Sequence, residues 1–186
     1  MTRKKKSIIE VDGRQYEAKY ISKGQYSTVY QVGNRVVMYT RGDCAKEVLA
    51  MYQYDKMAHL PEIIRHENTT VRPGSYYNVF SSPFYRNVTT KDRSAWNLMQ
   101  KIIIDFDYFE SYETYNKSCT IDYMQKFVNH IKEDPHMIRS VIRALNEIIQ
   151  VAGNCGNEVG FDFHKGNFGV NEYGTLIFRD VIWVRS

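Results

Sequence analysis

The chain has 186 residues, enough for one compact domain or for two small lobes. Hydrophobic residues make up 43% and charged residues 25%, as in an ordinary globular protein, and no apolar run approaches the roughly 20 residues needed to cross a bilayer. Much of the formal net charge of +4 lies in Thr2 to Lys6, and one short basic run does not predict a nucleic-acid interface. Because this basic start lacks the apolar centre of a signal peptide, we expect a cytoplasmic protein.

The first part of the chain has the composition of β-strands. β-branched and aromatic residues fill several short stretches, two of which flank the turn Gly33-Asn34 and suit a β-hairpin. Apolar residues then recur at helical spacing from Cys44 to Met57, and Asp43 is a candidate N-cap for this helix. The strands expected here are Ser7 to Val11, Gln15 to Ser22, Thr28 to Val32, Arg35 to Thr40, Ile63 to Val71 and Tyr76 to Phe80.

After Ser81-Ser82-Pro83 the pattern becomes helical, and Gly153 is a natural stop for the clearest helix. The helices expected are Arg93 to Tyr108, Ile121 to Lys132 and His136 to Ala152, followed by short strands at Phe168 to Asn171 and Thr175 to Phe178. We therefore expect an α+β fold in two parts. Residues 1–82 would form a strand-rich N-lobe with one helix, and residues 83–186 a reduced helical C-lobe with a terminal hairpin.

The strongest functional signal is the stretch from Gly160 to Asn167, between the long helix and the last strand pair. Asp162 and Asn167 are five positions apart, which is the spacing of a kinase catalytic loop. The Asp162 carboxylate can accept a hydrogen bond from an attacking hydroxyl, and the Asn167 amide oxygen can bind a hard cation such as Mg²⁺. Asp180, just past the last predicted strand, can hold the same cation. The simpler alternative is that Asp162 and Asn167 only turn the chain.

A second signal is the turn Ser22-Lys23-Gly24, which lies with Ser27 between two of the expected strands. A turn of small residues lets backbone N–H groups approach phosphates closely. Ser22 and Ser27 replace two of the three glycines of the usual G-x-G-x-x-G pattern. By itself this stretch is an ordinary hairpin, and it gains weight only from its position ahead of the Asp162 loop.

Together these motifs resemble the protein-kinase-like superfamily, and in style they are similar to small bacteriophage kinases and to aminoglycoside phosphotransferases. Those proteins also carry an Asp-x-His-x-x-Asn loop, and the resemblance spans roughly Tyr20 to Val184. It implies a minimal protein-kinase-like fold that uses ATP and Mg²⁺. The implied roles are Asp162 as catalytic base with His164 and Lys165 in the same loop, Asn167 and Asp180 as metal ligands, Ser22, Lys23, Gly24 and Ser27 over the phosphates, and Glu47 at the family's ion-pairing position.

The sequence departs from the family at Met38, where the third strand should bring a lysine that contacts the phosphates and pairs with Glu47. Methionine offers no charge and no hydrogen-bond donor. Lys23, Lys19 and Arg41 are the candidate substitutes. We favour Lys23 or Lys19, because a neighbouring strand can deliver a long side chain into the same space.

Three functions are left open. The first is an enzyme that transfers the γ-phosphoryl group of ATP, with Mg²⁺, to a Ser or Thr hydroxyl on a protein, which would be a host protein if the chain is phage-type. The second is a pseudokinase that binds a partner protein, because Met38 replaces the lysine and the chain stops six residues after Asp180. The third, phosphorylation of a small molecule, rests on His164 and the aminoglycoside-type loop. We favour the enzyme, and the sequence does not indicate an oligomeric state.

Overall fold

The computed structural model of the chain describes residues 6–24, 27–51, 57–67, 78–112, 120–156 and 159–184. They form two compact units, one from the described residues of Met1–Tyr54 and Glu62–Phe84 and the other from those of Asp55–Pro61 and Tyr85–Ser186. The first unit is a sheet with one helix and the second is mainly helical, so the predicted α+β class is confirmed. The first unit extends through Phe84 because the strand Asn78–Pro83 continues its sheet.

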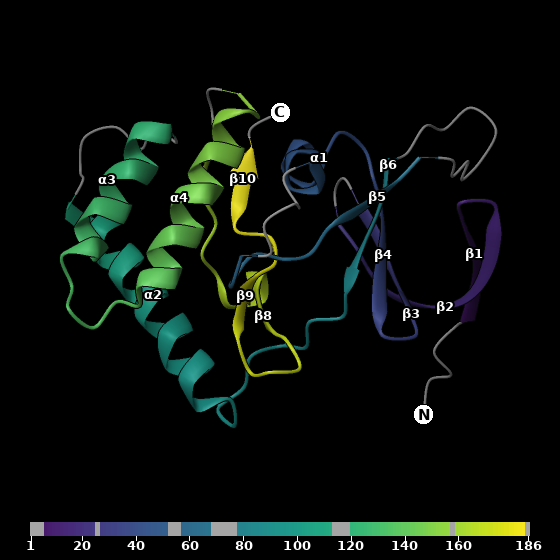
Figure 1. Cartoon of the computed structure of the whole chain (residues 1–186), viewed down its shortest axis with the longest axis horizontal. Helices are drawn as coiled ribbons and strands as arrows, with labels where there is room; N and C mark the ends of the chain where they lie inside the picture. The colour runs from purple at the N-terminus through teal and green to yellow at the C-terminus, as the bar shows by residue number, and fades with distance from the viewer. Residues whose placement is uncertain are drawn as a thin grey trace. The chain divides into compact units, whose positions relative to one another are not determined.

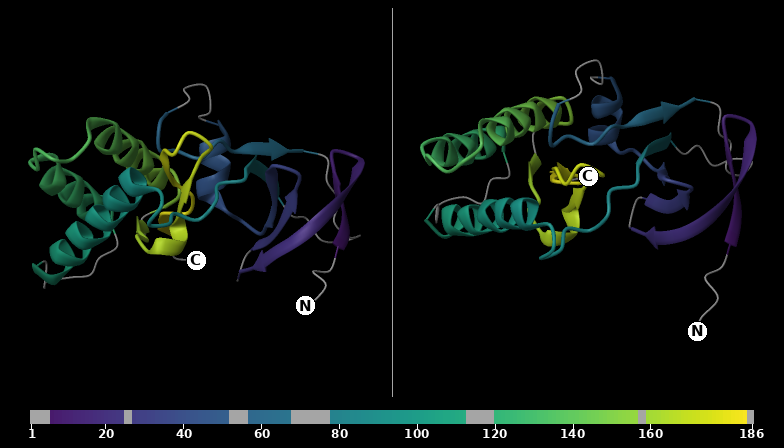
Figure 2. Two further views of the ribbon diagram at one scale, coloured as in Figure 1. Left: turned by 90° about the horizontal axis from the view of Figure 1, so that it is seen from below. Right: turned by 60° about the horizontal axis from the view of Figure 1, so that its bottom comes forward.

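The first unit contains an antiparallel sheet of six strands in the order β1-β2-β3-β4-β6-β5 (Figures 1 and 2). Gly33 has a φ of 58°, which glycine adopts without steric cost, and it makes the predicted turn between β3 and β4. The strands are β1 Lys6–Val11, β2 Arg14–Lys23, β3 Ser27–Val32, β4 Arg35–Thr40, β5 Ile64–His66 and β6 Asn78–Pro83. The four strands predicted before residue 41 are thus confirmed.

The remaining elements of the first unit were predicted less closely. The strand expected over Ile63 to Val71 is described only as β5, and residues 68–77, which include the start of the strand expected over Tyr76 to Phe80, lie outside the described residues. The helix α1 spans Cys44–Met51, and residues 52–56 of the longer predicted helix also lie outside them. Asp43 is confirmed as its N-cap, because Asp43 Oδ1 accepts a hydrogen bond of 3.1 Å from the Lys46 amide.

The second unit is built on three helices, α2 Arg93–Tyr112, α3 Ile121–Lys132 and α4 Arg139–Gly153 (Figure 1). The predicted bounds of α3 are confirmed, whereas α2 runs four residues further and α4 begins three residues later than expected. Each helix turns an apolar stripe inward, and Met99, Phe127 and Leu145 are fully buried examples from the three stripes. No helix among the described residues is long and apolar enough to span a membrane.

Two small two-stranded sheets complete the second unit. The strands β8 Phe168–Val170 and β9 Leu176–Phe178 pair as the sequence predicts, and the short 3-10 helix η1 Lys165–Asn167 leads into them. The pairing of β7 Val159–Phe161 with β10 Ile182–Val184 was not predicted. These strands are three residues long and pair across a separation of about twenty residues, so the local pattern of neither one shows the other.

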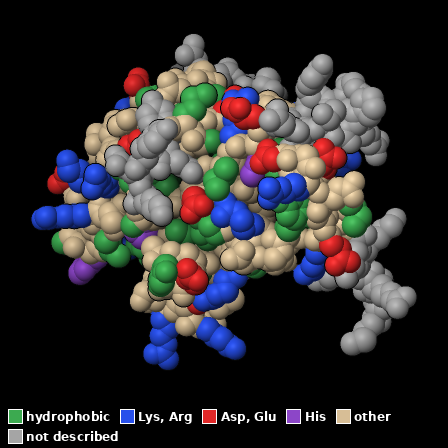
Figure 3. Space-filling view, turned by 45° about the vertical axis from the view of Figure 1, so that its right-hand side comes forward, with side chains coloured by type: hydrophobic (Ala, Val, Ile, Leu, Met, Phe, Trp, Pro, Cys, Tyr) green, Lys and Arg blue, Asp and Glu red, His purple; other side chains and the backbone are tan. Residues whose placement is uncertain are grey.

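The surface carries charges of both signs. On the face drawn in Figure 3, Lys and Arg side chains are mixed with Asp and Glu side chains and with hydrophobic side chains. This mixture agrees with the small net charge of +4.

Candidate functional site

Asp162 lies where β7 ends, between two phenylalanines. Successive side chains of extended backbone point to opposite sides, so Phe161 and Phe163 share one side and Asp162 takes the other. The rings of Phe161 and Phe163 stack with their centroids 4.5 Å apart and are buried in the helical core, where both contact Phe106 and Phe127. The Asp162 side chain is 43% exposed. The core aromatics therefore hold the loop in place while leaving the carboxylate accessible.

Asn167 is only 8% exposed and is fastened to Asp162 by its side-chain amide. Its Nδ2 donates one hydrogen bond of 2.9 Å to the main-chain oxygen of Asp162 and one of 2.9 Å to Asp162 Oδ2. Because the amide is planar and its nitrogen is turned to Asp162, its oxygen Oδ1 is turned away from that residue. The two residues that the sequence paired by spacing are thus in direct contact.

The main chain brings Asp180 to the same place. The main-chain oxygen of Asn167 accepts hydrogen bonds from the main-chain amides of Arg179, at 2.8 Å, and Asp180, at 3.4 Å. The Asp162 amide donates to the Val181 oxygen at 2.9 Å. Asp162, Asn167 and Asp180 therefore belong to one main-chain network, although they come from two segments, and the Asp180 side chain is exposed.

His164 and Lys165 complete the loop but lie at its surface. His164 is 60% exposed, and its Nδ1 accepts a hydrogen bond of 3.1 Å from the Gly166 amide, which places the proton of a neutral ring on Nε2. That Nε2 is 3.6 Å from Asp162 Oδ2. A Cβ at Gly166 would lie 2.8 Å from His164 Cε1, so a side chain at this position would displace the exposed His164 ring. Lys165 Nζ lies 4.5 Å from the centre of the Trp96 ring on α2, a cation–π contact.

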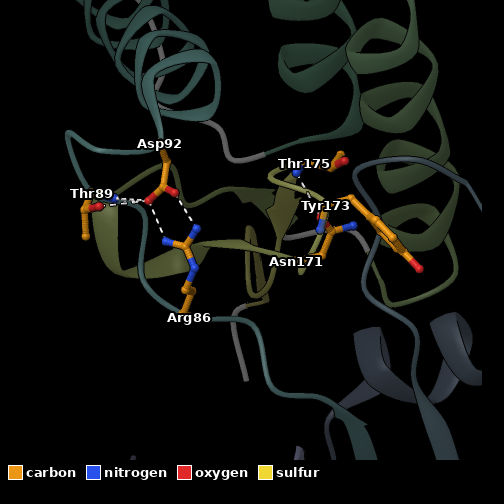
Figure 4. Close-up of polar contacts among 6 residues, drawn as sticks. All are labelled: Arg86, Thr89, Asp92, Asn171, Tyr173 and Thr175. Atoms are coloured by element: carbon orange, nitrogen blue, oxygen red, sulfur yellow. Dashed lines mark hydrogen bonds and ion pairs between the residues drawn. The ribbon is translucent and has the colours of Figure 1, made fainter.

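The segment between β6 and α2, residues 84–92, lies against β8 at Arg86. Figure 4 shows the hydrogen bonds that hold Arg86 to the end of this segment. The Arg86 guanidinium forms a two-pronged ion pair with Asp92, which also accepts hydrogen bonds from the amide and the hydroxyl of Thr89. These bonds hold the pKa of Asp92 well below its usual range. The Arg86 oxygen in turn accepts a 2.9 Å hydrogen bond from the Val170 amide of β8. At the tip of the β8–β9 hairpin, Asn171 Oδ1 accepts from the amides of Tyr173 and Thr175.

Sequence reasoning missed Arg179, which precedes Asp180 at the end of β9. Its guanidinium donates to the main-chain oxygens of Tyr85 and Gly166 and to Asn87 Oδ1. Its position gives a recognisable signal, because it is a cation that directly follows the buried strand Leu176–Phe178 and directly precedes a predicted metal ligand.

In the first unit, the predicted phosphate-binding turn is described in part. The Gly24 amide donates a hydrogen bond of 2.8 Å to the main-chain oxygen of Ser27, and residues 25 and 26 lie outside the described residues. The pairing of β2 with β3 shifts by one residue between Tyr20 and Ser22, which marks a β-bulge at the start of this turn.

The strand register decides which candidate cations share a face with Met38. Residues paired across neighbouring strands point to the same side of a sheet. Ser22 pairs with Val29 and Val29 with Met38, and Lys19 pairs with Gln31, which lies on the same side of β3 as Val29. Lys23 instead pairs with Thr28, and Thr28 pairs with Tyr39. These three residues therefore lie on the opposite side of the sheet, where Tyr39 is buried in the core. The register therefore favours Lys19 over Lys23 as a neighbour of Met38.

Glu47, from α1, has an amide partner at this face. Its Oε1 accepts a short hydrogen bond from Asn78 Nδ2 on β6. Asn78 pairs with Thr40, which is two residues beyond Met38 on β4 and therefore points to the same side. Glu47 is thus bound to an amide on β6, whereas the kinase-like pattern pairs this glutamate with a lysine at the position of Met38 on β4.

The carboxylates around Asp162 do not form a closed metal cage. In the described ranges, His, Cys, Asp and Glu side chains make no group of three or more that could hold a metal ion. A site made of Asp180, Asn167 and substrate phosphates does not require such a group, because Mg²⁺ is usually held by one or two carboxylates together with phosphates and water.

Comparison with known proteins gives a limited likeness. No family model and no curated protein matches this chain. Solved structures do match it, and two of them are phosphotransferases. They are the aminoglycoside phosphotransferase APH(4)-Ia, at 15% identity and a TM-score of 0.39 over 88% of this chain, and the spectinomycin phosphotransferase APH(9)-Ia in complex with ADP and spectinomycin, at 12% and 0.36 over 94%. This chain spans 65% of the length of each. At these identities and TM-scores the likeness leaves the activity of the chain open, and neither match is a bacteriophage kinase.

Proposed function

We propose that this chain is an ATP- and Mg²⁺-dependent phosphotransferase whose acceptor is a Ser or Thr hydroxyl on a protein. One observation carries the proposal, namely that Asp162, Asn167 and Asp180 share one hydrogen-bonded network while the Asp162 side chain is 43% exposed. An accessible carboxylate next to an amide and a second carboxylate is the set of groups that kinase-type phosphoryl transfer uses. That the target is a host protein stays a prediction from the resemblance to phage kinases.

Asp162 is the proposed general base. It accepts the proton of the acceptor hydroxyl as the hydroxyl oxygen forms a bond to the γ-phosphorus of ATP. The bond from that phosphorus to the oxygen bridging the β-phosphate breaks, and ADP leaves. Asn167 Nδ2 binds Asp162 Oδ2, which fixes the orientation of the carboxylate and leaves Oδ1 for the hydroxyl.

The oxygen atoms around the loop fit Mg²⁺, which prefers carboxylate and amide oxygens. Asp180 would supply a carboxylate and Asn167 its Oδ1, which is turned away from Asp162 because Nδ2 is committed to that residue. When bound, the ion neutralises charge on the β- and γ-phosphates.

The first unit would bind the nucleotide phosphates through Ser22, Gly24 and Ser27. Because Met38 replaces the usual lysine, phosphate binding needs another cation. Lys19 is the proposed substitute, since the strand register puts it on the same side of the sheet as Met38. The hydrogen bond from Asn78 keeps the Glu47 carboxylate at that same side.

The test is phosphotransfer from γ-labelled ATP to proteins of a cell extract and to the chain itself. Replacing a positioned general base should lower the rate by about 10²-fold or more, so Asp162→Asn is expected to remove nearly all label. Asp107→Asn, at an exposed position on α2, is the matched control and should label like the wild type. Equal labelling by wild type and Asp162→Asn would refute the enzyme.

A second candidate, a nucleotide-binding protein that acts on a partner without catalysis, is favoured by Met38 and by the amide beside Glu47. It predicts that ATP with Mg²⁺ raises the thermal midpoint although no phosphate is transferred. A ligand at about 100 times its dissociation constant adds about 2.7 kcal/mol to the unfolding free energy if it binds only the folded state. Label transfer that depends on Asp162 would exclude this candidate.

A further inference from the structure

The Arg179 side chain joins three segments of the second unit. Nη2 donates to the Gly166 oxygen at 2.7 Å and to Asn87 Oδ1 at 3.1 Å, and Nη1 donates to the Tyr85 oxygen at 3.0 Å. Gly166 lies in the turn that ends at Asn167, and Tyr85 and Asn87 belong to the segment between β6 and α2. Arg179 itself is joined to Asp180. The guanidinium therefore links the two proposed metal ligands to a third piece of chain.

Gly169 on β8 gives independent evidence that this path is built into the fold. A Cβ at Gly169 would lie 2.8 Å from Arg179 Cδ, 3.1 Å from Arg179 Nε and 2.8 Å from Tyr85 Cβ. Real Cβ atoms do not approach other atoms so closely, so only glycine lets the arginine side chain cross β8 at this point. The absence of a side chain at Gly169 thus leaves the space on β8 that the Arg179 side chain fills.

The environment of Arg179 is costly for a cation. The side chain is partly buried, and its three hydrogen bonds all go to neutral oxygens. Burying a charge against neutral partners adds little to stability. The fork of an arginine does, however, fix the relative positions of several acceptors better than any other side chain.

We propose that Arg179 is a positioning residue for the metal site: its guanidinium sets the separation of Asn167 and Asp180 by tying the 164–167 turn and the end of β9 to the 85–87 segment. This inference rests on the proposed function. Lysine at this position would keep the charge but not the fork, and so it would loosen the spacing of the two ligands. Residues that support metal ligands in this way typically change metal affinity by about 10–100-fold when replaced.

The experiment uses the full chain and three variants: Arg179→Lys, Arg179→Met and, as a matched control at an exposed position on α4, Arg143→Lys. The first measurement is amide hydrogen exchange without ligands at Arg179 and Asp180, whose amides donate to the Asn167 oxygen. The second is the Mg²⁺ concentration that gives half of the thermal stabilisation by a saturating non-hydrolysable ATP analogue.

For both Arg179 variants we expect faster exchange at these two amides and a half-saturating Mg²⁺ concentration about tenfold higher, with stabilisation by the analogue without Mg²⁺ unchanged. Arg143→Lys should match the wild type in both measurements. If exchange or the Mg²⁺ dependence stays at the wild-type value in Arg179→Lys, Arg179 is not a positioning residue. If Arg179→Met does not fold, Arg179→Lys decides the result alone. If instead the wild type responds to neither nucleotide nor Mg²⁺, the proposed function is refuted, and the metal role of Arg179 with it.

Discussion

At the scale of single residues, His59 shows how a buried polar side chain can support a fold. It is 6% exposed and has a φ of 76°, unusual for a residue with a side chain. Its Nδ1 donates to the Leu176 oxygen at 2.8 Å, because a carbonyl can only accept, so in the neutral ring Nε2 accepts from the Ser140 hydroxyl at 3.0 Å. The ring also stacks on Phe178. His59 thus joins the β8–β9 hairpin to the start of α4.

This environment predicts a pH dependence of stability. Burial lowers the pKa of His59 below its ordinary value of 6.5, so in the range just below 6.5 the unfolded chain binds more protons than the folded chain. The unfolding free energy should therefore fall as the pH drops from 6.5 to the lower folded value. We expect His59→Gln to flatten this part of the curve in urea titrations between about pH 8 and about pH 5.5.

The matched control is His136→Gln, at an exposed position before α4. In this variant the unfolding free energy should fall with decreasing pH as steeply as in the wild type. A His59→Gln curve that falls as steeply as that of the wild type would show that other groups cause the loss of stability.

At the scale of elements, α3 and α4 begin differently. Thr120 caps α3, and its hydroxyl accepts a 3.3 Å hydrogen bond from the Tyr123 amide. At the same position of α4 stands Ile138, which makes no such bond and is 51% exposed. The start of α3 was predicted to the residue, whereas α4 begins three residues later than its apolar stripe indicated.

Thr120→Ala should lower the unfolding free energy by about 1 kcal/mol, because the Tyr123 amide loses its partner at the helix N-terminus. Urea unfolding monitored by circular dichroism measures this change. Thr120→Ser keeps the hydroxyl and should stay within about 0.5 kcal/mol of the wild type. An equal loss in both variants would assign the effect to the methyl group instead of the cap.

At the scale of the whole molecule, the two units have cores of different size. In the described part of the first unit the core is one small cluster, Ile9, Val11, Ala18, Val37, Tyr39 and Val79, and nine of the ten β2 side chains are exposed. The second has an extended cluster that includes buried side chains from all three of its helices. Because local stability follows buried apolar contact, the units should open with different free energies.

We therefore expect the amides of β2 to exchange with solvent well before those of α4, whose Val141, Ala144, Leu145 and Ile148 are buried. Native-state hydrogen exchange followed by mass spectrometry of peptides tests this order. Equal protection of β2 and α4 would mean that the chain opens only as a whole.

The sequence by itself determined what depends on near neighbours along the chain. Apolar spacing located α3, the pair Gly33-Asn34 located the turn between β3 and β4, and the five-residue spacing of Asp162 and Asn167 identified the loop in which they touch. These features arise because helix period, turn conformation and loop length are set within a few residues.

Only the tertiary structure decided what depends on pairing between distant segments. The strand register placed Lys19, and not Lys23, on the side of Met38, and the pairing of β7 with β10 brought Asp180 and Val181 to the Asp162 loop. Arg179 crosses β8 at Gly169 and so binds residues more than ninety positions away in the chain. Such contacts are fixed by the packing of the whole unit, so no local pattern of residue types specifies them.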